Sequence, residues 1–275
     1  MIINIIGLPR TGTTALYQTV FSGVNKRNNL IKRDPFMMTW DEPWIYQKED
    51  KNNLAKFNDE LSLKINRAVE LGTTGHLVIK THYGHLSDLK KHAPELYEKL
   101  FSVETYDIKI FRANIFETVL SLIILKDSQI KSSSGQMFTH NIDPEKGEEH
   151  YKNSIKELSY EINEEYFLNV FEGYIWQHHE MLMNHLNLSV DDYVLYENLP
   201  KTIKGMWESL KISSDDRFKF DMGDNFDIVT RKSTYNKADL IKNYEDLRNV
   251  ISRYNGFYDS MKLTDGIWTI KGIDF

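Results

Sequence analysis

The 275-residue sequence contains no cysteine, which excludes disulfide bonds and thiolate metal sites. It also lacks an excess of basic residues, because the formal net charge is −6 and the pI is near 5.9. A broad basic surface for nucleic acid or an anionic membrane is therefore not expected. If the protein binds an anionic ligand such as a phosphate, the basic residues that hold it are expected to be confined to the binding site.

The sequence has no long apolar run, and its first apolar stretch begins at position 2 without a basic segment before it. A signal peptide needs a basic region followed by an apolar one, and a membrane span needs about 20 apolar residues. On these grounds we expect a cytoplasmic protein without a membrane span.

Short continuous apolar runs separated by helical stretches are typical of a parallel sheet that is buried on both faces. Four such runs lie at 2–6, 77–79, 108–111 and 193–195, and helical patterns lie at about 13–21, 54–71, 115–125 and 164–186. The sequence predicts one α/β domain over residues 1–275, with a parallel central sheet flanked by helices. Each run ends in a polar or glycine-containing turn, where such sheets bind ligands.

Between residues 127 and 156 the chain is polar, with small and charged residues clustered at 132–135 and 144–147. A segment of this composition is either a solvated loop or a mobile lid over a binding site. Both interpretations stay open.

The first apolar run leads directly into the segment Gly7-Leu8-Pro9-Arg10-Thr11-Gly12-Thr13-Thr14. Its glycines have the G-x-x-x-x-G spacing of a phosphate loop, in which successive backbone N–H groups converge on an anion at a helix N-terminus. Thr13 stands where an ATP-binding loop has Lys, and Arg10 is the nearest replacement cation. This departure favours a ligand other than ATP.

The loop resembles the 5′-phosphosulfate loop of sulfotransferases, usually P-[KR]-[ST]-G-T-[TS]. Further segments resemble elements of the same family in the same order: Lys80-Thr81-His82, Arg112 running on to Ser121, Tyr196-Glu197-Asn198-Leu199 and Arg231-Lys232-Ser233. The resemblance covers roughly residues 1–250. It implies a P-loop NTPase-like sulfotransferase fold, the donor 3′-phosphoadenosine 5′-phosphosulfate (PAPS), the product 3′-phosphoadenosine 5′-phosphate (PAP) and no metal ion.

In such an enzyme the sulfuryl group moves in line from a phosphate oxygen of the donor to the acceptor, by analogy with phosphoryl transfer. The loop would stabilise the charge on the leaving oxygen through backbone N–H groups, including that of Gly12, and through four side chains: Arg10, Thr11, Thr13 and Thr14. Arg10 would act as an electrostatic clamp, because a guanidinium does not give up its proton.

The resemblance implies that His82 is the general base. Imidazole titrates close to neutral pH and can take the proton of an attacking hydroxyl. Lys80 lies two residues earlier on the same face of the strand, where its ammonium would reach the transferring sulfonate. The competing interpretations are a structural histidine for His82 and a strand-end salt bridge for Lys80.

The resemblance also implies that Arg112 and Ser121 hold the 3′-phosphate of the donor and that Arg231 and Lys232 close over it. Two departures weaken this part of the match. The separation of Arg112 from Ser121 is nine residues, whereas many relatives have eight, and Ser233 replaces the usual Gly. A solvated charge pair is the alternative interpretation of Arg231 and Lys232.

Aromatic residues are candidates for covering the ligands. Relatives often have a Trp directly after the loop to cover adenine, but this chain has Ala15 there, so Tyr196 is the candidate for that role. The acceptor pocket is predicted among Phe36, Met37, Met38, Trp40, Trp44 and Tyr46, for which core packing is an equal alternative.

The leading prediction is a PAPS-dependent sulfotransferase acting on a hydroxyl or amine of a small-molecule or sugar acceptor. Two alternatives stay open: a nucleotide-dependent small-molecule kinase that uses the same loop with Mg²⁺, and a nucleotide-binding protein without catalysis. No metal site is predicted, because neither His82 with His85 nor the run His178-His179-Glu180 has the spacing of a zinc site.

Overall fold

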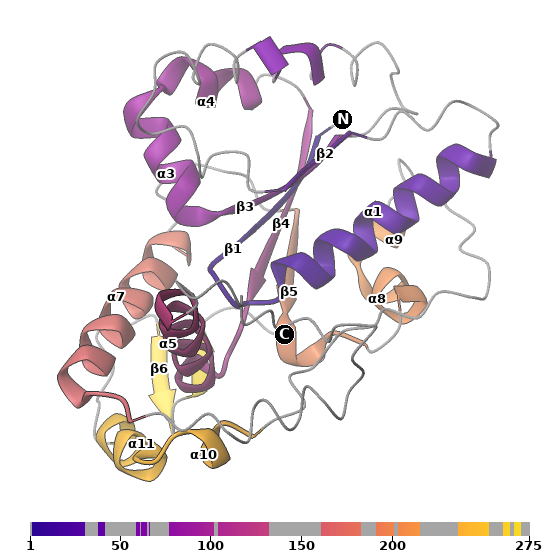
Figure 1. Cartoon of the computed structure of the whole chain (residues 1–275). Coiled ribbons are helices and arrows are strands. Elements are labelled where there is room, and N and C mark those ends of the chain that lie inside the picture. The colour runs from indigo at the N-terminus through magenta and orange to yellow at the C-terminus, as the bar shows by residue number, and fades with distance from the viewer. Residues whose placement is uncertain are drawn as a thin grey trace. The chain divides into compact units, whose positions relative to one another are not determined.

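The computed structural model describes residues 2–30, 38–41, 59–60, 62–64, 66, 77–101, 104–131, 161–182, 191–200, 203–214, 236–252, 261–264 and 267–270 (Figure 1). The chain divides into two compact units. The sheet unit comprises Met1–Phe111, Glu180–Val229 and Phe275, and the second unit comprises Arg112–His179 and Thr230–Asp274. The organisation as one domain over 1–275 stays a prediction.

The sheet unit is built on five strands, which are β1 (Ile2–Gly7), β2 (Met38–Asp41), β3 (Leu77–His82), β4 (Thr105–Phe111) and β5 (Asp192–Leu195). Their order is β2-β3-β1-β4-β5, and every neighbouring pair is parallel. All four predicted apolar runs form strands, so the α/β class and the parallel sheet are confirmed. The strand β2 was not predicted, because a four-residue edge strand of mixed polarity has no clear signal in the sequence.

The strand β1 lies in the middle of the sheet, and all six of its residues are buried. Burial on both faces explains why its sequence is almost continuously apolar rather than alternating. The register pairs Gly7 with His82 of β3 on one side and with Ile110 of β4 on the other. The carboxyl end of β1 is therefore level with the end of β3 and close to the end of β4.

The described helices of the sheet unit are α1 (Thr13–Leu30), α3 (Tyr83–His92), α4 (Pro94–Leu100), α8 (Ile203–Ser209) and α9 (Lys211–Ser214), with a 3₁₀ turn, η3, at Tyr196–Asn198. Leu16 and Val20 of α1 share one buried cluster with Ile5 of β1, which fixes the helix on the sheet. Gly23 lets α1 approach α8 closely, because a Cβ atom there would lie 2.7 Å from the indole ring of Trp207.

The second unit contains α5 (Ile115–Lys131), most of α7 (Glu164–Leu182), α10 (Lys237–Leu240), α11 (Tyr244–Ser252) and the antiparallel pair β6 (Met261–Thr264) and β7 (Ile267–Ile270). Aromatic rings join three of its helices. The ring centroid of Phe116 on α5 is 5.7 Å from that of Phe167 on α7 and 5.2 Å from that of Tyr244 on α11. Edge-to-face contacts of this kind stabilise a core beyond their buried area.

Three of the predicted helices are confirmed, and two of them are longer than predicted: α1 extends to Leu30 and α5 to Lys131. Residues 127–131 of the predicted polar insertion therefore continue α5, and its residues 132–156 lie outside the described residues. Within the predicted helix 54–71 the described residues 59–60, 62–64 and 66 are helical. No helix in the described part of the chain is long and apolar enough to cross a membrane.

Two side chains of the sheet unit donate hydrogen bonds to the last carbonyl groups of α7. Lys109 Nζ of β4 lies 3.2 Å from the Met181 carbonyl oxygen, and Tyr83 Oη of α3 lies 3.1 Å from that of Glu180. The carbonyls at a helix C-terminus lack helical partners and carry partial negative charge, so both contacts stabilise this end. Lys109 is only 1% exposed, and its burial lowers its pKa to about 8.

The lowered pKa of Lys109 predicts a specific dependence of stability on pH. Below pH 8 the folded chain bears the cost of a buried ammonium, and between pH 8 and 10.5 the unfolded chain holds a proton that the folded chain has lost. The free energy of unfolding of the wild type should therefore rise relative to Lys109→Met across this window, by about 3 kcal/mol. Urea unfolding at several pH values measures it. The exposed residue Lys91 supplies the control Lys91→Met, and a constant difference between wild type and Lys109→Met would contradict the prediction.

Candidate functional site

The segment between β1 and α1 has the backbone of an anion-binding loop. Arg10 has a φ of 70° and Gly12 a φ of 92°. Thr11 lies between them and closes the turn, with its N–H and its hydroxyl both donating to the carbonyl oxygen of Leu8, at 3.3 and 2.8 Å. When residues with a positive φ alternate with residues with a negative φ, successive backbone N–H groups point to the same side of the chain. They then form a concave site that can bind an anion. A positive φ at a non-glycine residue such as Arg10 costs about 1–2 kcal/mol and is typical of functional loops.

The two glycines of the motif are required for different reasons. At Gly7 a Cβ atom would lie 2.6 Å from Thr13 Cγ2, 2.7 Å from Thr11 Oγ1 and 2.8 Å from Ile110 Cγ2, so the loop closes tightly over the end of β1. At Gly12 the positive φ already disfavours a side chain, and a Cβ atom would lie 2.8 Å from Tyr196 Cε2 and nearer still to Cδ2. The tyrosine ring therefore lies against the loop backbone.

The strand β3 brings two of the predicted residues to the loop. Lys80 is 4% exposed, and its Nζ donates a hydrogen bond of 3.1 Å to the hydroxyl of Thr14 in the first turn of α1. His82 ends β3 opposite Gly7 and occupies the N-cap position of α3. The buried ammonium of Lys80 adds a second cation to the one that Arg10 supplies within the loop.

His85 is a neighbour of His82 that the sequence analysis considered only as a metal ligand. Its ring centroid is 5.3 Å from that of His82, and the two rings are inclined at 64°. The spacing of three residues, with His85 in the first turn of α3, is the signal that predicts this contact. No group of three or more His, Asp or Glu side chains suited to a metal occurs among the described residues.

The structure brings eight of the predicted residues together in the sheet unit, namely Arg10, Thr11, Gly12, Thr13, Thr14, Lys80, His82 and Tyr196. Arg112 and Ser121 belong to the second unit, where Arg112 precedes α5 and Ser121 lies buried on that helix. Arg231 and Lys232 lie outside the described residues. Of the predicted acceptor aromatics, Trp40 lies in β2 and Phe36, Trp44 and Tyr46 lie outside the described residues.

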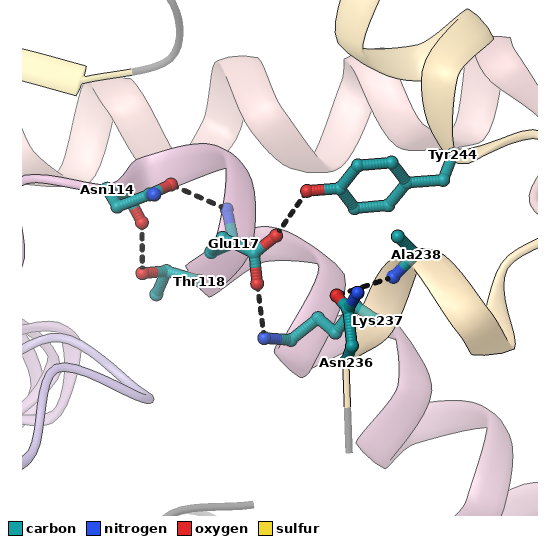
Figure 2. Close-up of polar contacts among 7 residues, drawn as sticks. All are labelled: Asn114, Glu117, Thr118, Asn236, Lys237, Ala238 and Tyr244. Carbon is teal, nitrogen blue, oxygen red and sulfur yellow. Dashed lines mark hydrogen bonds and ion pairs between the residues drawn. The ribbon is translucent and has the colours of Figure 1, made fainter.

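The sequence analysis also missed a cluster of polar side chains in the second unit around Glu117, whose carboxylate Lys237 and Tyr244 bind (Figure 2). The signal for it was present, because Asn114 and Glu117 have the spacing of a helix N-cap and its third helical residue. The partners of Glu117 come from a segment about 120 residues later, so the rest of the cluster has no local signal.

No protein-family model matches the chain, and a comparison with curated proteins finds no match. The fold defines an α/β protein, with a glycine-containing loop at the carboxyl edge of a parallel sheet. A more specific assignment depends on the residues of the loop and of β3.

The conformation of Gly12 predicts that Gly12→Ala lowers the free energy of unfolding by about 1–3 kcal/mol, because the new Cβ strains the backbone and overlaps the ring of Tyr196. Gly173 in α7 offers a matched control, since a Cβ atom there meets nothing within 4 Å. Gly173→Ala should raise the free energy of unfolding by about 0.5–1 kcal/mol. Urea denaturation measures both, and a neutral Gly12→Ala would show that the loop adapts without strain.

Proposed function

We propose that the protein is a PAPS-dependent sulfotransferase of the P-loop NTPase-like kind. The observation that carries the proposal is the hydrogen bond from Lys80 to Thr14. It joins the two segments that most resemble the sulfotransferase family, the loop at 9–14 and the Lys80-Thr81-His82 strand end. Two segments far apart in the sequence thus meet at one edge of the sheet, as a single site would require.

The proposed reaction is direct transfer. The acceptor oxygen forms a bond to sulfur while the bond between sulfur and the donor phosphate oxygen breaks, and the acceptor proton passes to His82. The pair of electrons from the broken bond remains on PAP, whose 5′-phosphate oxygen gains negative charge. The loop N–H groups, the guanidinium of Arg10 and the hydroxyls of the loop would stabilise that charge.

Lys80 would bind the sulfonate oxygens during transfer. Its ammonium is a cation beside the loop, where the contact with Thr14 holds it, and a cation there would stabilise the negative charge of a sulfonate. The contact also supports the enzyme alternative. A lysine from the neighbouring strand supplies the cation that an ATP-binding loop carries at position 13, and this favours a small-molecule kinase as the second candidate.

Binding of PAP distinguishes the candidates. PAP should raise the melting temperature of the purified protein, whereas ATP with Mg²⁺ should leave it unchanged. By mass action a ligand at 100 times its dissociation constant stabilises the folded state by about 2.7 kcal/mol. A shift with ATP and Mg²⁺ alone would replace the sulfotransferase proposal by the kinase. A shift with PAP, without sulfuryl transfer from PAPS to any of a panel of phenols, alcohols, amines and sugars, would favour the non-catalytic nucleotide-binding protein.

Substitution of the proposed base separates chemistry from binding. His82→Ala should lower turnover with PAPS by a factor of about 10²–10⁴, because the attacking hydroxyl loses its proton acceptor, while the thermal shift with PAP persists. Lys91→Ala, at an exposed position on α3, is the control and should keep full turnover. Release of PAP with a responsive acceptor measures the rate, and an unimpaired His82→Ala enzyme would rule out this role.

A further inference from the structure

His82 and His85 form a pair of neighbouring imidazoles where β3 ends and α3 begins. Their ring centroids are 5.3 Å apart, and the ring planes are inclined at 64°. Both side chains are partly buried. Rings in an edge-to-face arrangement attract one another, because the positive edge of one ring lies against the negative face of the other. The pair belongs to the sheet unit, and His82 lies opposite Gly7, where the loop begins.

The backbone of His82 is fixed on both sides, but the backbone does not fix the ring. His82 pairs with Gly7 in the parallel sheet, and its φ of −84° and ψ of 143° belong to an N-cap residue before α3. Its imidazole makes no capping hydrogen bond to that helix. The last torsion of a histidine side chain is broad and has no sharp minima. The orientation of the ring therefore depends on the side chains around it.

His85 lies on a helix turn that is anchored within the sheet unit. Tyr83 begins the helix and is 4% exposed, and its hydroxyl donates to the carbonyl oxygen of Glu180 at 3.1 Å. Leu86 and Leu89 are buried on the same helix. Side chains that packing holds in place can keep a neighbouring functional group in one geometry. His85 is therefore placed to support the ring of His82.

The orientation of His82 matters for the proposed reaction. A general base must lie within hydrogen-bonding distance of the proton that it takes, and a misplacement of about 1 Å can lower the rate by a factor of about 100. Lys80 lies on the same face of β3 as His82 and is held by the hydroxyl of Thr14. A sulfonate bound by Lys80 would have a fixed place, so the base must be aimed at the oxygen that attacks it.

We propose that His85 is a positioning residue that holds the imidazole of His82 in the orientation in which it takes the proton of the acceptor. The inference rests on the proposed function, because it takes His82 as the general base. It assigns His85 no contact with donor or acceptor and no proton transfer. The ring of His85 acts through the edge-to-face contact, which restricts rotation of the His82 ring.

Two substitutions at His85 test the ring contact in turnover. His85→Ala removes the ring and should lower kcat with PAPS about tenfold while KM for PAPS stays within about twofold, because the aim of the base affects the transition state and not donor binding. His85→Phe keeps an aromatic ring and should retain kcat within about threefold. Gly84→Ala is the matched control in the same turn. Gly84 is exposed and a Cβ atom there meets nothing within 4 Å, so this variant should turn over as the wild type does.

A second measurement reports on the ring of His82 without any need for activity. Carbon-13 relaxation of the imidazole C–H bonds gives an order parameter for the ring. In the wild type and in His85→Phe this parameter should be that of a rigid group, and in His85→Ala it should fall below about 0.6. Urea unfolding of each variant shows whether the fold is retained.

The outcomes separate the two proposals. A wild type that transfers no sulfuryl group from PAPS would overturn the proposed function, and the role of His85 with it, whatever the order of the ring. A wild type that turns over, together with a His85→Ala protein of unchanged kcat or unchanged ring order, would overturn only the role of His85. Equal losses of kcat in His85→Ala and His85→Phe, or a loss of PAP affinity as large as the loss of kcat, would also overturn it. If His85→Ala does not fold, His85→Leu removes the aromatic ring and provides the same comparison.

Discussion

At Gly7 the central strand passes into the loop so close to Thr11, Thr13 and Ile110 that no Cβ atom fits there. The parallel pairing of β1 with β3 and β4 makes this close fit a constraint on the whole site, because the register that fixes Gly7 also fixes His82 on one side. Backbone hydrogen bonds set the spacing of the strands, so the loop and the end of β3 have little freedom to separate. The contact between Lys80 and Thr14 depends on this arrangement.

Both units use charged and polar side chains to fix the ends of helices. In the sheet unit the ammonium of Lys109 and the hydroxyl of Tyr83 bind the last carbonyls of α7. In the second unit Glu117 lies in the first turn of α5, where a negative charge complements the helix dipole, and it is bound by Lys237. Buried charges are costly unless they are paired, so each such contact restricts its helix to one position.

The sheet could be predicted because its strands are buried on both faces, which leaves the continuous apolar runs seen at 2–6 and 108–111. The loop could be predicted because glycine spacing reflects local backbone geometry, and the positive φ of Gly12 agrees with it. The edge strand β2 and the extension of α5 to Lys131 were not predicted. Short edge strands and helix ends have weak local preferences, and packing with distant residues determines them.

The amino-acid sequence was sufficient to establish the α/β class, the order of the main elements and the candidate residues at the strand ends, since these depend on local periodicity and on residue chemistry. Three contacts could be identified only from the tertiary structure. Tyr196 lies against Gly12, Lys80 bonds to Thr14, and Lys237 and Tyr244 converge on Glu117. Each joins residues between 66 and 184 positions apart. Such contacts arise when strands and helices pack in one register, and no pattern within a single segment encodes that register.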